Sequence, residues 1–282
     1  MTHKTIINIC LTLIALCWTM AIQAQTVTID GINYSLNADA KTAEVTKSTA
    51  TGDIVIPEKI TVDGVEYSVT SIGMEAFKDS KALTSVTMPW VTIIGHQAFY
   101  SCSRLTSVDM PLVTSIEYQA FQSCSNLTSV AMPLVKSIDY EAFYSCPITN
   151  LSLPATLTSI GNSCFTETRG ITLAATTPAA LGTNVFWKYA VICVPESAVD
   201  AYRTAAGWSN YKDQIRSMSD IIDYDVTVTA QEKESGLLNV LGQANLSKVV
   251  SLKVTGTING YDIMAIRNKM PYLHYLDLTD AT

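Results

Sequence analysis

The sequence is poor in charged residues, and in basic ones above all. Charged residues make up 15% of the 282-residue chain, and 18 Lys and Arg face 25 Asp and Glu, which gives a net charge of −7. Nucleic acids and anionic membranes both attract dense clusters of positive charge, so we expect neither as a partner. Disorder is also excluded, because hydrophobic residues reach 48% and such a chain can bury a core.

The groups on which most enzymes depend are scarce. The chain has three histidines, and only His96 and His274 follow the first 24 residues. A catalytic nucleophile needs a neighbouring base and a third group that orients it, and a structural zinc site needs four ligands. There is no Gly-rich phosphate loop and no motif that pairs carboxylates. We therefore expect no enzyme, cofactor or metal site, and we interpret both histidines as structural or solvated.

Only one apolar segment stands out, at the N-terminus. A basic start precedes a mostly apolar run over residues 6–16, and a polar tail ends at the small residue Ala24. This pattern is typical of a secretory signal peptide, which we place at residues 1–24. The run is too short to span a bilayer, and no other stretch does. Leu16 stands before Cys17, where a lipoprotein signal has a small residue, so a lipid anchor is not expected. We predict a secreted or cell-surface protein.

Beyond this segment the sequence repeats every 22 residues. One unit alone cannot cover its apolar side chains, but stacked units share a continuous apolar column. The sequence therefore predicts a solenoid. The repeat is carried by Phe77, Phe99, Phe121, Phe143 and Phe165, by Ile72, Ile94, Ile116, Ile138 and Ile160, and by Leu, Val, Met and Pro positions that keep the same register.

Each unit combines two short strands with turns. Residues 113–116 alternate branched apolar and small polar residues, which favours a strand. The motif Ala-Phe-x-x-Cys that follows predicts one helical or 3₁₀ turn that places the Phe in the core. Residues 105–110 match L-x-x-L-x-L, the strand signature of a leucine-rich repeat, and Pro111 ends that strand.

The regions that flank the repeats have other patterns. Residues 25–68 predict a β-strand cap at the N-terminal end, and residues 69–217 predict the leucine-rich repeat solenoid with a C-terminal cap. Residues 218–282 predict a small α+β segment that ends in a second L-x-x-L-x-L strand at 273–278. An uncovered leucine-rich strand is an exposed edge that proteins normally avoid. We therefore interpret this segment as the start of a second, apparently truncated leucine-rich-repeat-like domain.

The repeats resemble a known family. Residues 69–89, 91–111 and 113–133 follow the pattern Val-Thr-Ser-Ile-Gly-x-x-Ala-Phe-x-x-Cys-x-x-Leu-Thr-Ser-Val-x-Met-Pro, which resembles the BspA-type bacterial leucine-rich repeat. The resemblance covers roughly 25–217. It implies a secreted or surface-exposed bacterial protein that adheres to host matrix proteins, host cells or other bacteria.

Three cysteines share one repeat position. Cys102, Cys124 and Cys146 are predicted to stack about 4.8 Å apart, the spacing of parallel strands. A disulfide tolerates that separation, and a secretory compartment is oxidising. However, the five cysteines beyond residue 24 cannot all pair, and the position follows a buried Phe. We therefore interpret them as buried thiols that pack as small hydrophobes, with a disulfide as the open alternative.

The candidate functional residues lie on the surface of the solenoid. Extended faces of repeat proteins commonly bind partners, and exposed aromatics favour protein or sugar contacts. We predict a binding or adhesion module for a host or bacterial surface protein, or a glycan. The alternatives are a scaffold with no ligand of its own, and tyrosines that merely cover the core. The outward strand positions are Ser85, Thr87, Ser107, Asp109, Ser129, Ala131, Asn150 and Ser152, and the aromatics are Tyr100, Tyr118, Tyr140, Tyr144 and Trp90.

Overall fold

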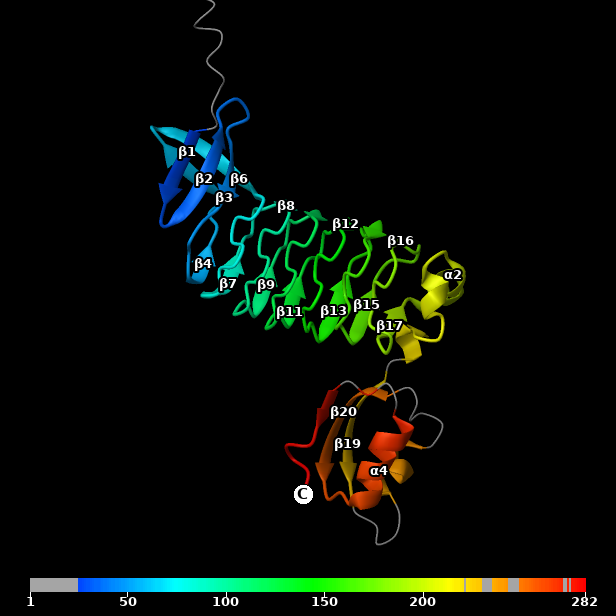
Figure 1. Cartoon of the computed structure of the whole chain (residues 1–282). Helices are drawn as coiled ribbons and strands as arrows, with labels where there is room; N and C mark the ends of the chain where they lie inside the picture. Colours follow the sequence, from blue (N-terminus) through cyan, green and yellow to red (C-terminus); the bar gives the residue numbers. More distant parts are fainter. Residues whose placement is uncertain (1–24, 221, 230–234, 243–248, 271–272, 274) are drawn as a thin grey trace, which may run out of the picture.

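The computed structural model describes residues 25–220, 222–229, 235–242, 249–270, 273 and 275–282. It forms a β-rich repeat solenoid followed by a smaller α/β unit (Figure 1). The predicted signal peptide with Cys17, and His274, lie outside the described residues. No helix within the described ranges is long and apolar enough to cross a membrane.

The N-terminal cap is built from antiparallel hairpins. Strand β2 pairs with β1 and β3, and β5 pairs with β6. Asp30-Gly31 and Asp63-Gly64 turn two of these hairpins with both residues at positive φ, as the Asp-Gly signal requires. Strand β3 then pairs in parallel with β6, which begins the repeat array. The strands are β1 (Gln25–Ile29), β2 (Ile32–Asn37), β3 (Thr42–Thr46), β5 (Lys59–Val62) and β6 (Val65–Ile72).

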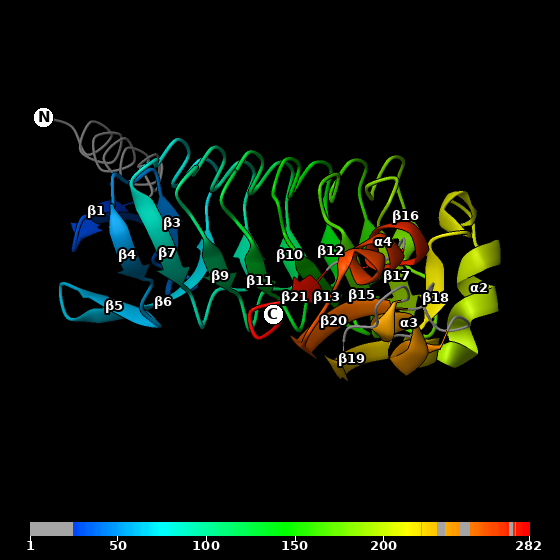
Figure 2. The same ribbon diagram turned by 90° about the horizontal axis from the view of Figure 1, so that it is seen from below.

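Each repeat coil contributes one strand to each of two parallel arrays of strands, and the coils stack side by side (Figure 2). We call the first array the short-strand sheet; it comprises β8 (Ile93–Ile94), β10 (Ser115–Ile116), β12 (Ser137–Ile138), β14 (Ser159–Ile160) and β16 (Ala180–Leu181). The second comprises β4 (Gly52–Val55), β7 (Leu83–Thr87), β9 (Ser107–Asp109) and β11 (Ser129–Ala131), and then β13 (Asn150–Leu153), β15 (Gly170–Leu173), β17 (Val191–Val194) and β18 (Ile215–Ser217). The predicted repeat solenoid is confirmed.

A column of stacked phenylalanine rings fills the coils. The rings of Phe77 to Phe165 are fully buried, and neighbouring ring centroids lie 5.0 to 5.4 Å apart. The ring planes of Phe99 and Phe121 are almost parallel, at 3°. The 22-residue period therefore places each Phe directly over the one before it, and no coil can cover its own ring without a neighbour.

The segment around each Phe differs from the expected helical or 3₁₀ turn. Alternate backbone N–H groups bond three residues back, as in Tyr100 to Gln97, or one coil onward, as in Phe99 to the carbonyl of Ala120 at 2.7 Å. Gln97 and Ser101 adopt positive φ, at 52° and 58°, which no helix permits. The coil thus shares its backbone donors with the next coil, and the local sequence pattern carries no sign of that sharing.

The cysteines form a second buried column. The thiols of Cys102, Cys124 and Cys146 donate to the carbonyls of Phe77, Phe99 and Phe121, at 3.0 to 3.1 Å. The five cysteines of the described chain are buried, so the expected burial is confirmed. Burial raises the pKa of the Cys124 thiol and raises that of Cys164 to about 12, which keeps both protonated and unreactive.

A strand, a proline and a short helix close the C-terminal end of the array. Beyond β17 come η1 (Glu196–Ala198), α2 (Val199–Thr204) and η2 (Trp208–Tyr211). The buried indole of Trp208 donates to the carbonyl of Ala179 at 2.7 Å, and the hydroxyl of Tyr202 donates to that of Ala175 at 3.1 Å. These two rings therefore satisfy the backbone of the last coil while they cover its core.

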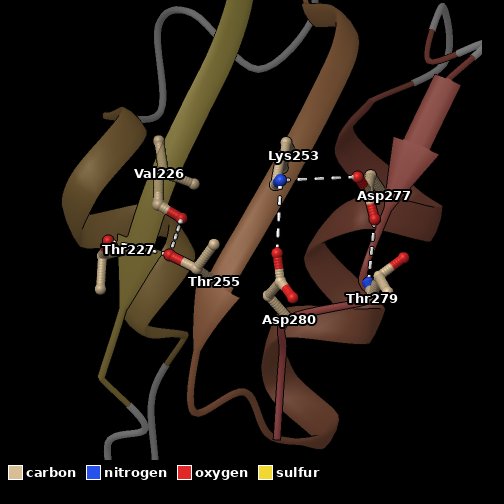
Figure 3. Close-up of polar contacts among 7 residues, drawn as sticks. All are labelled: Val226, Thr227, Lys253, Thr255, Asp277, Thr279 and Asp280. Atoms are coloured by element: carbon tan, nitrogen blue, oxygen red, sulfur yellow. Dashed lines mark hydrogen bonds and ion pairs between the residues drawn. The ribbon is translucent and has the colours of Figure 1, made fainter.

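The α/β unit alternates strands and helices. After η3 (Met218–Asp220), it comprises β19 (Ile222–Val228), α3 (Gly236–Leu241), β20 (Val249–Gly256), α4 (Gly260–Lys269) and β21 (Tyr275–Asp277), with the strands parallel in that order. Its aliphatic core is a separate cluster from that of the array. Polar contacts tie its strands together: Lys253 reaches Asp277 and Asp280, and the hydroxyls of Thr227 and Thr255 lie 2.9 Å apart (Figure 3).

Candidate binding surfaces of the repeat array

Six of the eight predicted strand residues form one surface, while Asn150 and Ser152 lie on β13, in a separate sheet. Strand pairing places Ser85, Ser107 and Ser129 in one row, and Thr87, Asp109 and Ala131 in the next. All of these side chains point outward, and Ser85 is half-buried. The carboxylate of Asp53 accepts hydrogen bonds from the hydroxyls of Thr84 and Ser85, each at 2.7 Å, and these bonds lower the pKa of Asp53. We call this surface the strand face.

The four predicted tyrosines do not form one ridge. Tyr118 and Tyr140 follow the short-strand sheet and stack with their ring centroids 5.5 Å apart and 9° between their planes. Tyr100 and Tyr144 stand at another repeat position, and Gln122 occupies the coil between them. The Nζ atom of Lys78 lies 5.4 Å from the Tyr100 ring centroid. Trp90 is half-exposed in the loop after β7. Only one pair of the predicted tyrosines therefore makes a joint aromatic surface.

A groove that the sequence analysis missed runs along the short-strand sheet. It has a volume of about 570 Å³, and Ser115, Ser137 and Ser159 form its serine row. The hydroxyl of Ser137 donates to that of Ser115 at 3.2 Å. His96, Glu117 and Asp139 also line it, and we call it the serine groove. The sequence signal was present, since the serine precedes Ile every 22 residues, but the period alone does not say which row lines a groove.

The groove is hollow because its lining side chains are small and its coils approach closely. At Gly161 an added Cβ would lie 2.5 Å from the backbone nitrogen of Tyr140. A larger residue at Gly161 would require this backbone to shift, although Glu117 and Asp139 occupy the equivalent position in two other coils. The glycine therefore lets the coil lie against its neighbour, and the serines beside it leave the space above the sheet open.

Acidic and aromatic side chains flank the serine groove. The Nε2 atom of His96 lies 3.2 Å from a carboxylate oxygen of Glu117, and both side chains are partly exposed. The His96 ring also packs against Tyr118, at 5.9 Å between centroids. The carboxylate of Glu141 raises the pKa of the Tyr140 phenol, so that hydroxyl stays a hydrogen-bond donor. The groove therefore presents carboxylates, hydroxyls and stacked rings side by side.

Within the described ranges, no group of three or more His, Cys, Asp or Glu residues could hold a metal ion. His96 is a surface side chain that pairs with Glu117 and stacks on Tyr118. The array can therefore present hydrogen-bonding groups, negative charge and aromatic rings to a partner.

Comparison with known proteins agrees with this architecture. Six copies of a family model described as "BspA type Leucine rich repeat region" match residues 56–172. The array is thus a leucine-rich repeat solenoid, a non-catalytic repeat fold. Residues 56–172 are therefore repeats of the BspA type, and the chain is similar to a bacterial leucine-rich cell surface protein.

Solved structures of leucine-rich repeat proteins from several bacteria are similar to this chain. A leucine rich cell surface protein from Faecalibacterium prausnitzii is 32% identical, with a TM-score of 0.51 over 61% of this chain and 55% of that chain. This chain therefore spans about half of the F. prausnitzii protein. A leucine-rich repeat protein from T. pallidum is 21% identical, with a TM-score of 0.49 over 64% and 96% of the two chains. One from Bacteroides ovatus is 16% identical, with a TM-score of 0.33 over 91% and 89%. No curated protein matches the chain.

Proposed function

We propose that this protein is a secreted or surface-exposed adhesion module that binds a protein partner along the serine groove. The observation that carries the proposal is the combination of Glu117 and Asp139 in the groove with the Tyr118–Tyr140 stack beside it. The location is supported by the predicted signal peptide, and by the likeness to a F. prausnitzii protein described as a cell surface protein.

The chemistry of the groove suits a basic, extended segment of a partner. Carboxylates on successive coils recur at about 4.8 Å, the spacing of parallel strands, and can pair with Lys or Arg side chains. Arg also stacks on tyrosine rings. The serine hydroxyls can both donate to and accept from a peptide backbone. Since the chain is acidic overall, with a net charge of −7, long-range attraction favours a basic partner as well.

The strand face is the weaker candidate. It offers hydroxyls and the carboxylate of Asp109, but the sequence places no aromatic side chain in its two outward rows. Interfaces draw most of their affinity from a few aromatic and Arg anchors, while small polar residues contribute little. We therefore place the partner on the serine groove, and the strand face provides the matched control surface.

The test compares two single charge reversals. Glu117→Lys changes the serine groove, and Asp109→Lys makes the same change of charge on the strand face. The probes are purified host extracellular-matrix proteins immobilised on a sensor, with binding of the purified protein followed at two salt concentrations. We expect Glu117→Lys to weaken binding at least tenfold and Asp109→Lys to leave it within twofold. The affinity of the unmodified protein should fall as salt rises.

Other outcomes would remove the proposal. Loss of binding in Asp109→Lys alone would move the partner to the strand face. If both variants bound as tightly as the unmodified protein, both surfaces would be excluded. If the unmodified protein bound no matrix protein or host cell, a scaffold without a ligand of its own would be the better description.

A further inference from the structure

A second hollow lies at the other side of the coils and shares no lining residue with the serine groove. It has a volume of about 750 Å³, within the range of 300–1,000 Å³ typical of sites for small ligands. Its lining includes Trp187, Arg169, Glu167, Asn150 and Pro147. These residues come from the segments that lead into β13, β15 and β17, so three successive coils build it.

The hollow arises because the repeat shortens at this point. Nine positions separate Phe121 from Val130 on the strand that follows it, whereas Phe143 and Leu151 are eight apart. In the next coil Phe165 and Ile171, which pairs with Leu151, are six apart. The stacked rings keep their column, so the missing residues are taken from the connecting loops. The shorter loops leave an open space over the strand starts.

Aromatic and charged side chains occupy the walls of this space. The guanidinium of Arg169 lies over the Trp187 ring, with Cζ 5.2 Å from the ring centroid. Tyr189 packs edge-on against Trp187, at 5.1 Å between centroids and 82° between planes. Among the described residues, no ion pair or side-chain hydrogen bond holds Arg169 or Glu167. Stacking therefore orients the guanidinium while its N–H donors remain available to a ligand.

We propose that this hollow binds an oligosaccharide. A sugar ring has an apolar C–H face and a rim of hydroxyls. The Trp187 indole supplies an apolar surface for the first, and Arg169, Glu167 and Asn150 supply donors and acceptors for the second. The hollow contains one cationic and one anionic side chain, and is neutral in an acidic protein. That balance suits an uncharged polar ligand, whereas the acidic serine groove suits a basic peptide.

The experiment uses the purified full-length secreted protein and a printed array of defined oligosaccharides, and titration calorimetry follows with the strongest array ligand. Arg169→Gln and Glu167→Gln change exposed side chains, so neither should disturb the fold, and Trp187→Ala removes the apolar surface. The matched control is Trp90→Ala, which removes a half-exposed indole outside the hollow. We expect Arg169→Gln and Trp187→Ala to weaken binding at least tenfold, Glu167→Gln to weaken it severalfold, and Trp90→Ala to leave it unchanged.

Three results would overturn the proposal. The first is the absence of binding to any oligosaccharide on the array. The second is oligosaccharide binding that Arg169→Gln, Glu167→Gln and Trp187→Ala all leave intact. The third is that these variants lose binding to a matrix protein while no sugar binds, which would make the hollow a protein site. Glu117→Lys, which tests the serine groove, should leave sugar binding unchanged, so the two proposals fail independently.

Discussion

The repeat array and the C-terminal α/β unit both stack parallel strands, but at different spacings along the chain. Paired positions in the array, such as Ser115 and Ser137, lie 22 residues apart. In the unit, Val226 and Val254 lie 28 apart, and Leu252 and Leu276 lie 24 apart. In the unit the residues between the strands form helices α3 and α4, which cover its sheet in Figure 1, whereas in the array they form turns and the short strands.

The two regions therefore differ in how they satisfy the hydrogen bonds of their backbone N–H groups. The array coils form turns instead of a helix around each Phe, and alternate N–H groups there bond to the next coil, as Phe99 does to Ala120. A helix satisfies its own interior but leaves the first N–H groups without partners. In the unit, the buried carboxylate of Asp262 serves two helix starts. It accepts from the hydroxyl of Ser235 at 2.7 Å and from the backbone N–H groups of Leu237 and Asn259, both at 2.9 Å.

The comparison indicates where each region is vulnerable. The array distributes its stability over rings that repeat the same contact from coil to coil. The unit depends on a small aliphatic cluster and on one buried carboxylate. The two clusters of buried residues are separate, so a change in one core should leave the unfolding of the other unaffected.

Phe121→Ala should produce the largest effect. The ring is fully buried and stacked on both sides, and truncation of a buried Phe costs about 3–5 kcal/mol. Tryptophan fluorescence during urea unfolding measures the change, because the unit contains no Trp. Leu252→Ala, in the core of the unit, is the matched control and should leave that transition in place. A shift of the fluorescence transition by Leu252→Ala would show that the two regions unfold together.

Asp262→Ala should have the next largest effect, confined to the unit. It removes the acceptor that serves the Ser235 hydroxyl and the backbone N–H groups of Leu237 and Asn259. Buried groups left without partners cost about 1–3 kcal/mol each, and partial access of water reduces the total to roughly 2–4 kcal/mol. Amide hydrogen exchange in β20 should accelerate, while exchange in β10 and β12 should not change. Asp262→Asn keeps one acceptor oxygen, so its exchange rates should lie between those of the unmodified protein and those of Asp262→Ala. Unchanged exchange in β20 would mean that the carboxylate does not hold the helices.

The sequence predicted the structure correctly where the same residue type recurs in each coil and packs against its equivalent in the next coil. The rows of Phe and Ile could be placed in a core because every coil needs the same cover. Reasoning failed where a residue's partner lies one coil away and leaves no local pattern, as in the turns at Gln97 and Ser101. A glutamine or serine at positive φ is not a local preference, so only the bonds to the next coil impose it.

The binding surfaces were predicted in part, for a related reason. Alternation in the strands identified which residues of the strand face point outward. The serine groove lies on the other sheet, where the repeated serine carries the same period and so the same signal. The hollow at Trp187 depends on loops that become shorter over successive coils, and its Trp187, Arg169 and Glu167 belong to those loops. A periodic analysis treats such departures as degeneration of the repeat.

Alkaline pH should destabilise the array through its buried thiols. The unit has no cysteine, so this effect should be absent there. Burial raises the pKa of Cys164 from 9.0 to about 12. An unfolded thiol ionises from about pH 9, so the stability due to this thiol is complete below pH 9 and is lost as the pH rises towards 12. At pH 10 the loss due to Cys164 amounts to about 1.4 kcal/mol. Urea unfolding followed by Trp fluorescence at pH 8 and pH 10 should show a smaller loss in Cys164→Ala than in the unmodified protein. An equal loss in both would assign the effect to other groups.

The smallest effects should come from exposed ion pairs, and they should be alike in the two regions. His96 pairs with Glu117 in the array, and Lys253 contacts Asp280 in the unit at 3.3 Å. Exposed pairs contribute little, because water and salt screen them and because ordering both side chains costs entropy. We expect His96→Ala and Lys253→Ala each to shift the midpoint of thermal unfolding by no more than about 2 °C, and 1 M NaCl to abolish even that shift. A large effect at Lys253 would mean that its contacts across β20 and β21 hold the unit together. The contrast between the two regions would then lie at their surfaces as well as in their cores.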